Sequence, residues 1–360
     1  MRRQLFIVIV GAAIIASVGA AGQAPTAGPY KVLKTQKVGG TGGFDYIYAD
    51  VAARRLYIPR GAVQGATPMP ARVTVFDLDT LASVGEIPDT RANGAAVDVK
   101  SGHGFASSKP VAMWDTKTLK PIKTIDVQGN PDGILADPFN QRIYVLSHAA
   151  PHVTVIDAKD GSLLGTIDLG GAPEQAVTDE KGHIYVDVSD KANVAVIDAK
   201  TMTVTAHYDL GDTGAGLAGL ALDVKNHVLF VACRLPQPGV MVVLNADTGK
   251  IITTLPLAGA SDGAVFNPAT LEAFSTHGNG TMTIVKEKSP TSFEVEQNLE
   301  TMVGAKTLTL DTKTNHILTM TAEFGPLPPP ATPPAPGAPA GRGGRGPMVP
   351  DSFSILVVGK

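Results

Sequence analysis

The sequence predicts an all-β fold, a single seven-bladed β-propeller of four-stranded blades, and three observations lead to this prediction. One pattern recurs seven times along the 360 residues. Each copy contains four short stretches rich in Val, Ile and Thr, separated by turn-forming residues. No stretch keeps the 3.6-residue apolar period of an amphipathic helix. A repeat of about 44 residues that contains four strands is typical of a propeller blade.

An aspartate, replaced once by asparagine, marks the end of the first apolar stretch in every copy. The positions are Asp50, Asp98, Asp137, Asp179, Asp223, Asn267 and Asp311, with spacings of 48, 39, 42, 44, 44 and 44 residues. The third stretch of several copies also ends in aspartate, as in Val153–Asp157 and Val194–Asp198. Asp and Asn side chains bond to the backbone about two residues further on, so we expect these residues to form turns rather than to bind a ligand.

The two ends of the chain are predicted to share the last blade. The seventh copy supplies three strands, around residues 307–310, 316–321 and 352–358, and lacks a fourth. We expect the missing outer strand at Tyr30–Val38, near the start of the chain. Pairing of this segment with the last strand would close the ring and fix both termini in one sheet.

Composition excludes several other classes of protein. The 39 Gly and 27 Pro disfavour a helical bundle, because inside a helix they cost about 1 and 3 kcal/mol each. The single cysteine, Cys233, excludes a disulfide framework, a four-cysteine zinc site and a CxxCH haem attachment. The net charge of −3, which becomes −5 without Arg2 and Arg3, gives no basic surplus for binding nucleic acid.

Two segments are expected to lie outside the regular repeat. Residues 1–24 have the pattern of a secretory signal peptide, with Arg2 and Arg3 before the uncharged apolar run Leu5–Val18. This run is short for a membrane span, so the mature propeller, residues 25–360, is predicted to be periplasmic or secreted without a transmembrane domain. Residues 326–350 contain ten prolines, which predicts a disordered loop inserted in the last blade.

The most regular copies share a further pattern, carried by Asn130–Asp137, Arg142–Val145, His152–Asp157 and Thr166–Gly170. This pattern resembles the YVTN β-propeller repeat family, a group of exported bacterial proteins that includes YncE-like proteins. The resemblance implies a WD40-like ring that binds another molecule. It implies no particular ligand, because the family's asparagine at the end of the second strand is replaced here by Arg60, Ser108, Ser147, His277 and Thr321.

Polar side chains recur at two repeat positions on one face of the predicted ring. Five residues before each turn aspartate, where the innermost strand begins, stand Asp45, Asn93, Asp132, Glu174, Ala218, Asp262 and Lys306. The ends of the second strands carry Arg60, Lys109, His148, Arg234 and His277. Binding residues concentrate on loops that a rigid scaffold positions. We therefore predict a ligand-binding channel mouth made of Asp45, Arg60, Asn93, Asp132, His148, Glu174, Arg234, Asp262, His277 and Lys306.

Several chemical roles are open to this predicted site. Clustered carboxylates repel one another, which raises their pKa values or favours a cation, but Asp in such turns can also be purely structural. The arginines could bind a carboxylate or phosphate, and the histidines a metal or a proton. If a cation binds, the predicted ligands are Asp45, Asn93, Asp132, Glu174 and Asp262, whose oxygen atoms suit Ca²⁺ or Mg²⁺.

The first functional hypothesis is an exported, non-catalytic binding or scaffold protein without a cofactor. Its partner would be a small molecule, peptide, glycan or protein bound at the channel face, with no specific nucleic acid expected. The alternative is a metal-assisted lactonase or related hydrolase, in which a divalent cation polarises a carbonyl and activates water. A third class, a redox partner, is disfavoured by the lack of a Cys/His cofactor set. No residue is assigned a catalytic role.

Overall fold

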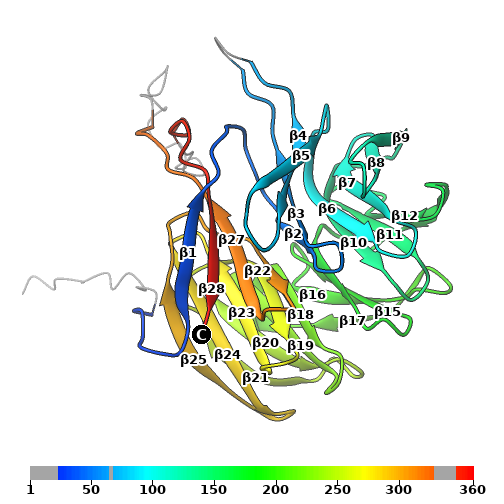
Figure 1. Ribbon diagram of the computed structural model, residues 1–360. Helices are drawn as coiled ribbons and strands as arrows, with labels where there is room; N and C mark the ends of the chain where they lie inside the picture. Colours follow the sequence, from blue (N-terminus) through cyan, green and yellow to red (C-terminus); the bar gives the residue numbers. More distant parts are fainter. Residues whose placement is uncertain (1–22, 65–67, 328–345) are drawn as a thin grey trace, which may run out of the picture.

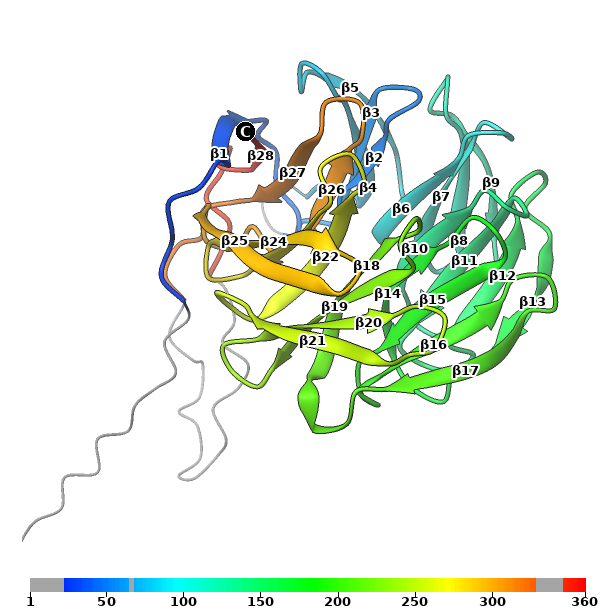
Figure 2. The same ribbon diagram turned by 90° about the horizontal axis from the view of Figure 1, so that it is seen from below.

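Seven four-stranded antiparallel sheets surround a central axis in the computed structural model, which describes residues 23–64, 68–327 and 346–360 (Figure 1 and Figure 2). Within these ranges the only helix is one 3₁₀ turn, Gly211–Thr213. The first strand of each repeat is innermost, and the innermost strands of neighbouring sheets contact one another around the ring. The predicted all-β, seven-bladed propeller is confirmed.

Each blade follows the predicted four-strand repeat. Blades one and two consist of β2 (Tyr48–Asp50), β3 (Arg55–Arg60), β4 (Arg72–Asp77), β5 (Ser83–Ile87), and β6 (Ala92–Asp98), β7 (His103–Ser108), β8 (Val111–Asp115), β9 (Pro121–Ile125). Blades three and four consist of β10 (Pro131–Asp137), β11 (Arg142–Ser147), β12 (Val153–Asp157), β13 (Leu163–Ile167), and β14 (Pro173–Thr178), β15 (His183–Val188), β16 (Asn193–Asp198), β17 (Thr203–Asp209). Blades five and six consist of β18 (Ala215–Asp223), β19 (Val228–Leu235), β20 (Val240–Asn245), β21 (Ile251–Pro256), and β22 (Ser261–Asn267), β23 (Glu272–His277), β24 (Thr281–Ser289), β25 (Ser292–Glu300). Blade seven consists of β26 (Leu308–Asp311), β27 (His316–Thr321), β28 (Ser354–Gly359) and β1 (Lys31–Lys37).

The predicted closure by the two chain ends is also confirmed. β1 pairs antiparallel with β28, from Lys31 opposite Gly359 to Lys37 opposite Ser354, and the two strands lie side by side in Figure 1. Just before β1, the backbone of Tyr30 exchanges two hydrogen bonds of 2.9 Å with the Gln297 side chain on β25. The N-terminal segment therefore completes blade seven and also fastens it to blade six.

The hydrophobic core lies between the blades rather than at one centre. Tyr144 of blade three packs in one cluster with Ile184 of blade four, and Leu56 of blade one packs with Phe353 of blade seven. Burying one side chain of this size stabilises the fold by about 1.5–3 kcal/mol. Because such clusters need two blades, each blade depends on both neighbours, as in other repeat proteins.

The repeated aspartates form turns, as predicted. An Asp98 carboxylate oxygen accepts a hydrogen bond of 2.7 Å from the Ser101 N–H, and Asp179 accepts one of 2.7 Å from the Lys181 N–H. The single asparagine of the series, Asn267, does the same with the Ala269 N–H at 3.0 Å. These side chains are occupied by local backbone and end the innermost strands on the face opposite the predicted site.

The predicted Pro-rich loop is anchored at both of its ends. The Gly325 N–H donates to the Pro347 carbonyl at 2.8 Å, and the Val349 N–H donates to the Glu323 carbonyl at 2.8 Å. These bonds extend the pairing of β27 and β28 into the predicted loop. Residues 328–345 of that loop, like residues 1–22 of the predicted signal peptide, lie outside the described residues. In the described ranges, no helix has the length and hydropathy needed to cross a membrane.

Two buried carboxyl groups lie close together between blades five and six. Glu287 on β24 and Asp223 at the end of β18 are each only 1% exposed. One oxygen of Glu287 accepts a hydrogen bond of 2.7 Å from the Asn226 amide. Burial and the neighbouring Asp223 carboxylate raise the pKa of Glu287 to about 7. The folded protein therefore retains a proton on Glu287 at pH values where an unfolded chain has released it.

Removal of residues 23–38 is expected to lower the thermal unfolding midpoint markedly. β28 would become an unpaired edge, and Tyr30 and Val32 would leave the apolar cluster between blades six and seven. Thermal unfolding followed by circular dichroism measures the change. The control is Lys34→Ala, which removes one exposed side chain of β1 and should have little effect. If the truncated protein unfolds at the same temperature as the full chain, closure by β1 does not stabilise the ring.

The substitution Glu287→Gln is expected to change how stability varies with pH. In the wild type, stability should fall as pH rises from about 4.5 to about 7, because the unfolded chain releases its proton first. Glutamine has no such proton, so E287Q should gain on the order of 2 kcal/mol relative to the wild type between pH 5 and pH 8. Urea unfolding at both pH values measures this, with the exposed Glu294→Gln as control. If E287Q and the wild type differ in stability by the same amount at pH 5 and at pH 8, the raised pKa of Glu287 is contradicted.

Candidate functional site

All the predicted site residues except Arg60 and His277 meet at one end of the central channel. We call this group the charged mouth; it consists of Asp45, Asn93, Asp132, His148, Glu174, Arg234, Asp262 and Lys306. Most of its members stand at or just before the start of an innermost strand. His148 and Arg234 arrive from the ends of second strands, β11 and β19. The repeat thus places both predicted positions on one face.

Two basic side chains join the carboxylates on one side of the charged mouth. The Lys306 ammonium lies 2.9 Å from a carboxylate oxygen of Asp45 and 2.5 Å from one of Asp262. The Arg234 guanidinium lies 2.5 Å from the other oxygen of Asp262 and 3.3 Å from Glu174. Asp262 is therefore shared by two cations. The carboxylate repulsion considered from the sequence is largely offset by charges that the chain itself supplies.

The pKa values of Asp262 and Asp45, two acids on this side of the charged mouth, are shifted in opposite directions. Burial alone would raise the pKa of Asp262, but Lys306 and Arg234 outweigh it and hold that pKa below its ordinary value. Burial prevails at Asp45, whose pKa is raised although Lys306 partly offsets the effect. Asp262 therefore keeps its negative charge more firmly than Asp45 does, and it stabilises the positive charge of both neighbours.

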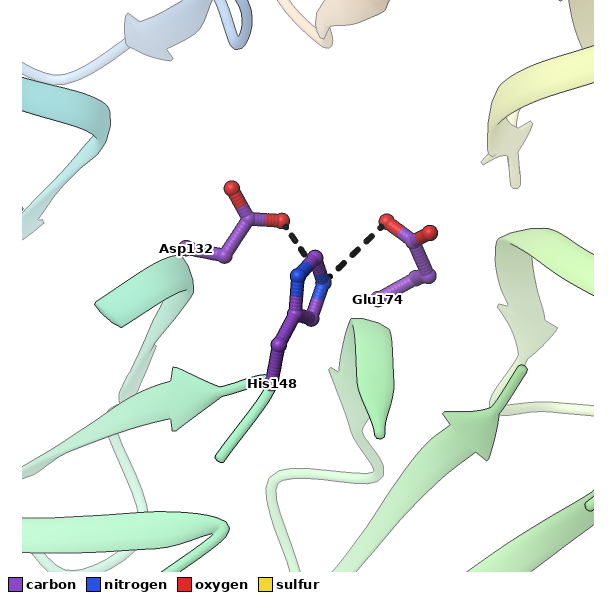
Figure 3. Close-up of side chains that lie close together, drawn as sticks. All are labelled: Asp132, His148 and Glu174. Carbon is purple, nitrogen blue, oxygen red and sulfur yellow. Dashed lines mark ion pairs between the residues drawn. The ribbon is translucent and has the colours of Figure 1, made fainter. Parts of the chain in front are cut away.

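A histidine lies between two carboxylates on the other side of the charged mouth (Figure 3). Nε2 of His148 is 3.3 Å from Oδ2 of Asp132 and 3.8 Å from Oε2 of Glu174. The adjacent carboxylates of Asp132 and Glu174 raise the pKa of His148 to about 10. The imidazole is therefore a cation at neutral pH in this ion pair. In the part of the chain that the structure describes, these three side chains are the one His/Cys/Asp/Glu group spaced to hold a metal ion.

Each of these two carboxylates is also held from outside by another side chain. The Asn93 amide donates to Oδ1 of Asp132 at 2.7 Å, and Arg234 contacts Oε1 of Glu174 at 3.3 Å. In both groups the remaining oxygen, Oδ2 or Oε2, is the one that faces His148. The orientation of both carboxylates is thus set before any ligand arrives.

Two side chains that the sequence analysis missed cross the channel beneath the charged mouth. The Tyr46 hydroxyl, from blade one, lies 3.3 Å from Asp132 and 3.2 Å from the carbonyl oxygen of Glu174. From blade four, the Gln175 side chain accepts from the Leu220 N–H at 3.1 Å and donates to the Ala264 carbonyl at 3.0 Å. Through these contacts Tyr46 reaches blades three and four, and Gln175 reaches blades five and six.

The repeat pattern of the sequence does mark the position of Tyr46 and Gln175 as unusual. The repeat position after the start of the innermost strand holds glycine in four copies, at Gly94, Gly133, Gly219 and Gly263. A Cβ added at Gly219 would come within 2.7 Å of the Ala264 nitrogen, so the inner strands approach too closely there for a side chain. Large side chains at this position, Tyr46 and Gln175, therefore have to extend into the channel.

A third missed residue, Asp187, lies directly behind the charged mouth. It is completely buried in β15, and one of its oxygens accepts the backbone N–H groups of Glu174 at 3.2 Å and Gln175 at 2.5 Å. Burial raises the pKa of Asp187 to about 7. Its carboxyl group fixes the backbone at the start of β14 and so positions Glu174. The corresponding residues of blades two and three are Ser107 and Leu146, so an acid at this position was a usable signal.

Arg60 and His277 do not join the charged mouth, which corrects their predicted placement. Arg60 is only 1% exposed, and its guanidinium lies 3.7 Å from the centre of the Phe353 ring. Burial and the nearby Arg72 lower the pKa of Arg60 to about 9. His277 is completely buried with Nδ1 2.9 Å from the Thr281 hydroxyl, and burial lowers its pKa to about 4. Both side chains pack within the protein at strand ends instead of facing the channel.

The two ends of the channel differ in chemistry. A cavity of about 400 Å³ adjoins the charged mouth, and its lining includes Arg234, Gln237, Asp262 and Asn279. A cavity of about 680 Å³ opens at the other end and is lined mainly by apolar residues, including Leu135, Val177, Leu220, Leu222, Val265 and Phe266. Of the predicted site residues, Arg234 and Asp262 line the polar cavity.

Replacement of Arg234 by methionine is expected to lower the free energy of unfolding by about 1–2 kcal/mol. Glu174 and Asp262 would remain partly buried without their shared partner, although solvent screens a side chain that is 35% exposed. Urea unfolding at low salt measures the loss. The matched control is Lys37→Met, which breaks an exposed pair with Glu323 and should cost less than about 0.5 kcal/mol. Equal losses in the two variants would show that the charged mouth contributes no more than a surface pair.

Comparison with known proteins supports the fold and no more. No family model matches the chain, and no curated protein was found to match it. Among solved structures, a chain of the mitotic checkpoint complex matches with a TM-score of 0.65 and 11% identity, covering 88% of this chain and 95% of that one. A chain of hydrazine synthase from Kuenenia stuttgartiensis matches with a TM-score of 0.65 and 15% identity, covering 78% and 92%. At these identities the likeness shows a shared propeller fold.

Proposed function

We propose that the protein is a non-catalytic binding protein that takes a small polar ligand of both charge signs at its charged mouth. The observation that carries this proposal is a pair of fixed opposite charges in the wall of one polar cavity, next to the other alternating charges of the mouth. Arg234 and Asp262 line that cavity and pair with each other at 2.5 Å, and each has a further partner of opposite charge. A rigid ring that presents polar groups at a concavity is the usual form of a small-molecule site.

The charges favour a zwitterion over an ion of one sign. A ligand carboxylate would compete with Glu174 or Asp262 for the Arg234 guanidinium, which forms bidentate pairs with such groups. The protein carboxylate released in this way would then need a cation, and an ammonium group of the same ligand can supply it. Free amino acids and short peptides have this chemistry.

The hydrolase alternative is less well supported by the geometry of its proposed ligands. Of the five oxygen ligands expected for Ca²⁺ or Mg²⁺, Asp45 and Asp262 are paired with Lys306 or Arg234, and Asn93 is bonded to Asp132. Burial raises the pKa of the Cys233 thiol to about 12, which disfavours a nucleophilic thiolate. Binding without catalysis therefore remains the better proposal.

Export and family membership belong to the same proposal. The apolar run Leu5–Val18 after Arg2 and Arg3 supports secretion, and the repeat segments from Asn130 to Gly170 support membership of the YVTN repeat family. The intact mass of protein recovered from the periplasm or medium tests export, because loss of about the first 24 residues is expected. A full-length chain retained in the cytoplasm would contradict it.

The binding proposal is tested with a panel of free amino acids and dipeptides. Some zwitterions should raise the unfolding midpoint of the wild type, whereas acetate and ethylamine, which carry one charge, should not. R234M should lose this shift. The matched control is Lys109→Met, at the equivalent strand end of blade two, where the ammonium contacts only the Gly129 carbonyl. A panel that gives no shift, or an equal shift with R234M, would overturn the proposal.

A further inference from the structure

We propose that Asp132, His148 and Glu174 form a binding site for one divalent first-row transition metal ion of the Zn²⁺ class. The three donor atoms come from neighbouring blades, three and four, and all lie within 4.8 Å of one another. Figure 3 shows the three side chains converging from separate segments of the chain. The proposal concerns the metal alone and does not depend on the binding of a zwitterion.

The distances between the donor atoms suit a small ion. Zinc bonds to nitrogen and oxygen measure about 2.0–2.2 Å, so donors at the corners of a tetrahedron lie roughly 3.3–3.5 Å apart. Nε2 of His148 and Oδ2 of Asp132 are already 3.3 Å apart, and Nε2 and Oε2 of Glu174 are 3.8 Å apart. All three donor atoms lie within 4.8 Å of one another, so a movement of at most about 1.5 Å at the Glu174 carboxylate brings them to tetrahedral spacing.

The surrounding side chains orient the donors as the outer partners of metal ligands do. Asn93 bonds to the far oxygen of Asp132 at 2.7 Å, and Arg234 to the far oxygen of Glu174 at 3.3 Å. The near oxygens are left facing Nε2, with the Tyr46 hydroxyl 3.3 Å from that of Asp132. Such outer hydrogen bonds fix carboxylate ligands, and their loss commonly weakens metal binding 10–100-fold.

The backbone beneath the donors is also restrained. Asp132 is only 6% exposed and stands at the start of β10, while Glu174 begins β14, where the buried Asp187 bonds to its N–H at 3.2 Å. The His148 N–H donates to the Asn130 carbonyl at 3.2 Å. A site on rigid elements loses little conformational freedom when it binds an ion.

The donor set selects the class of ion. One imidazole and two carboxylates suit Zn²⁺, Co²⁺ or a similar ion, whereas Ca²⁺ prefers six to eight oxygen ligands. The ion would take the place of the proton that His148 carries in the ion pair, and this proton would be released to solvent. This differs from the all-oxygen set predicted from the sequence, because His148 replaces Asp45, Asn93 and Asp262. The His148 side chain is 38% exposed, which leaves the ion a route from solvent and an open position for water.

Titration of the chelator-treated full chain with ZnCl₂ in a calorimeter tests the proposal. We expect one equivalent to bind, CoCl₂ to bind with a visible spectrum of nitrogen and oxygen ligation, and CaCl₂ to give at least tenfold weaker binding. Each of His148→Ala, Asp132→Asn and Glu174→Gln should weaken Zn²⁺ binding at least tenfold. Circular dichroism and thermal unfolding show whether each variant is folded, and three separate variants keep the test informative if one is not.

The matched control is His183→Ala. His183 forms a pair of 2.8 Å with Asp179 on the other face of the ring, and within the described residues it belongs to no group of three side chains spaced for a metal ion. This variant should bind one equivalent of Zn²⁺ with wild-type affinity. The proposal is overturned if the wild type binds no Zn²⁺, if H148A binds it as tightly as the wild type, or if H183A loses it. In those cases Asp132, His148 and Glu174 form ion pairs with one another and bind no metal ion. The panel of amino acids and dipeptides tests the proposed function separately.

Discussion

Burial of apolar side chains between neighbouring blades is the interaction on which the rest of the structure depends. A single four-stranded sheet has two apolar faces, and it covers them only with the sheets on either side. The ring satisfies this requirement for all blades at once, provided that the last blade is complete. Pairing of β1 with β28 meets that condition and places segments from opposite ends of the sequence in one sheet. The inter-strand distances at the channel follow from this closed geometry.

The charged mouth is a direct result of the same closure. Its members come from all seven blades, yet each cation lies between two carboxylates. Lys306 lies between Asp45 and Asp262, and Arg234 lies between Asp262 and Glu174. His148 continues the alternation between Glu174 and Asp132. With His148 protonated, four acids face three cations, so the charges that the chain itself supplies nearly balance within the ring.

The repeat period was sufficient to predict the fold and the face of the site, because turn aspartates and strand starts recur at fixed spacing. It could not predict which side chains pair. By repeat position alone, Arg60 and His277 were predicted to face the channel, as Arg234 does. In the structure the side chains of Arg60 and His277 are instead buried within the protein. Tyr46 and Gln175 were missed because only charged groups were sought at the strand starts, although glycine in the other copies marked that position as crowded.

The two side chains that cross the channel have a mechanical consequence. Tyr46 connects blade one with blades three and four, and Gln175 connects blade four with blades five and six. They act as spokes across the ring, in addition to the contacts between neighbouring blades. Spokes oppose flattening of the ring, so the charged groups above them are preorganised, and a bound molecule need not supply energy to reshape its site.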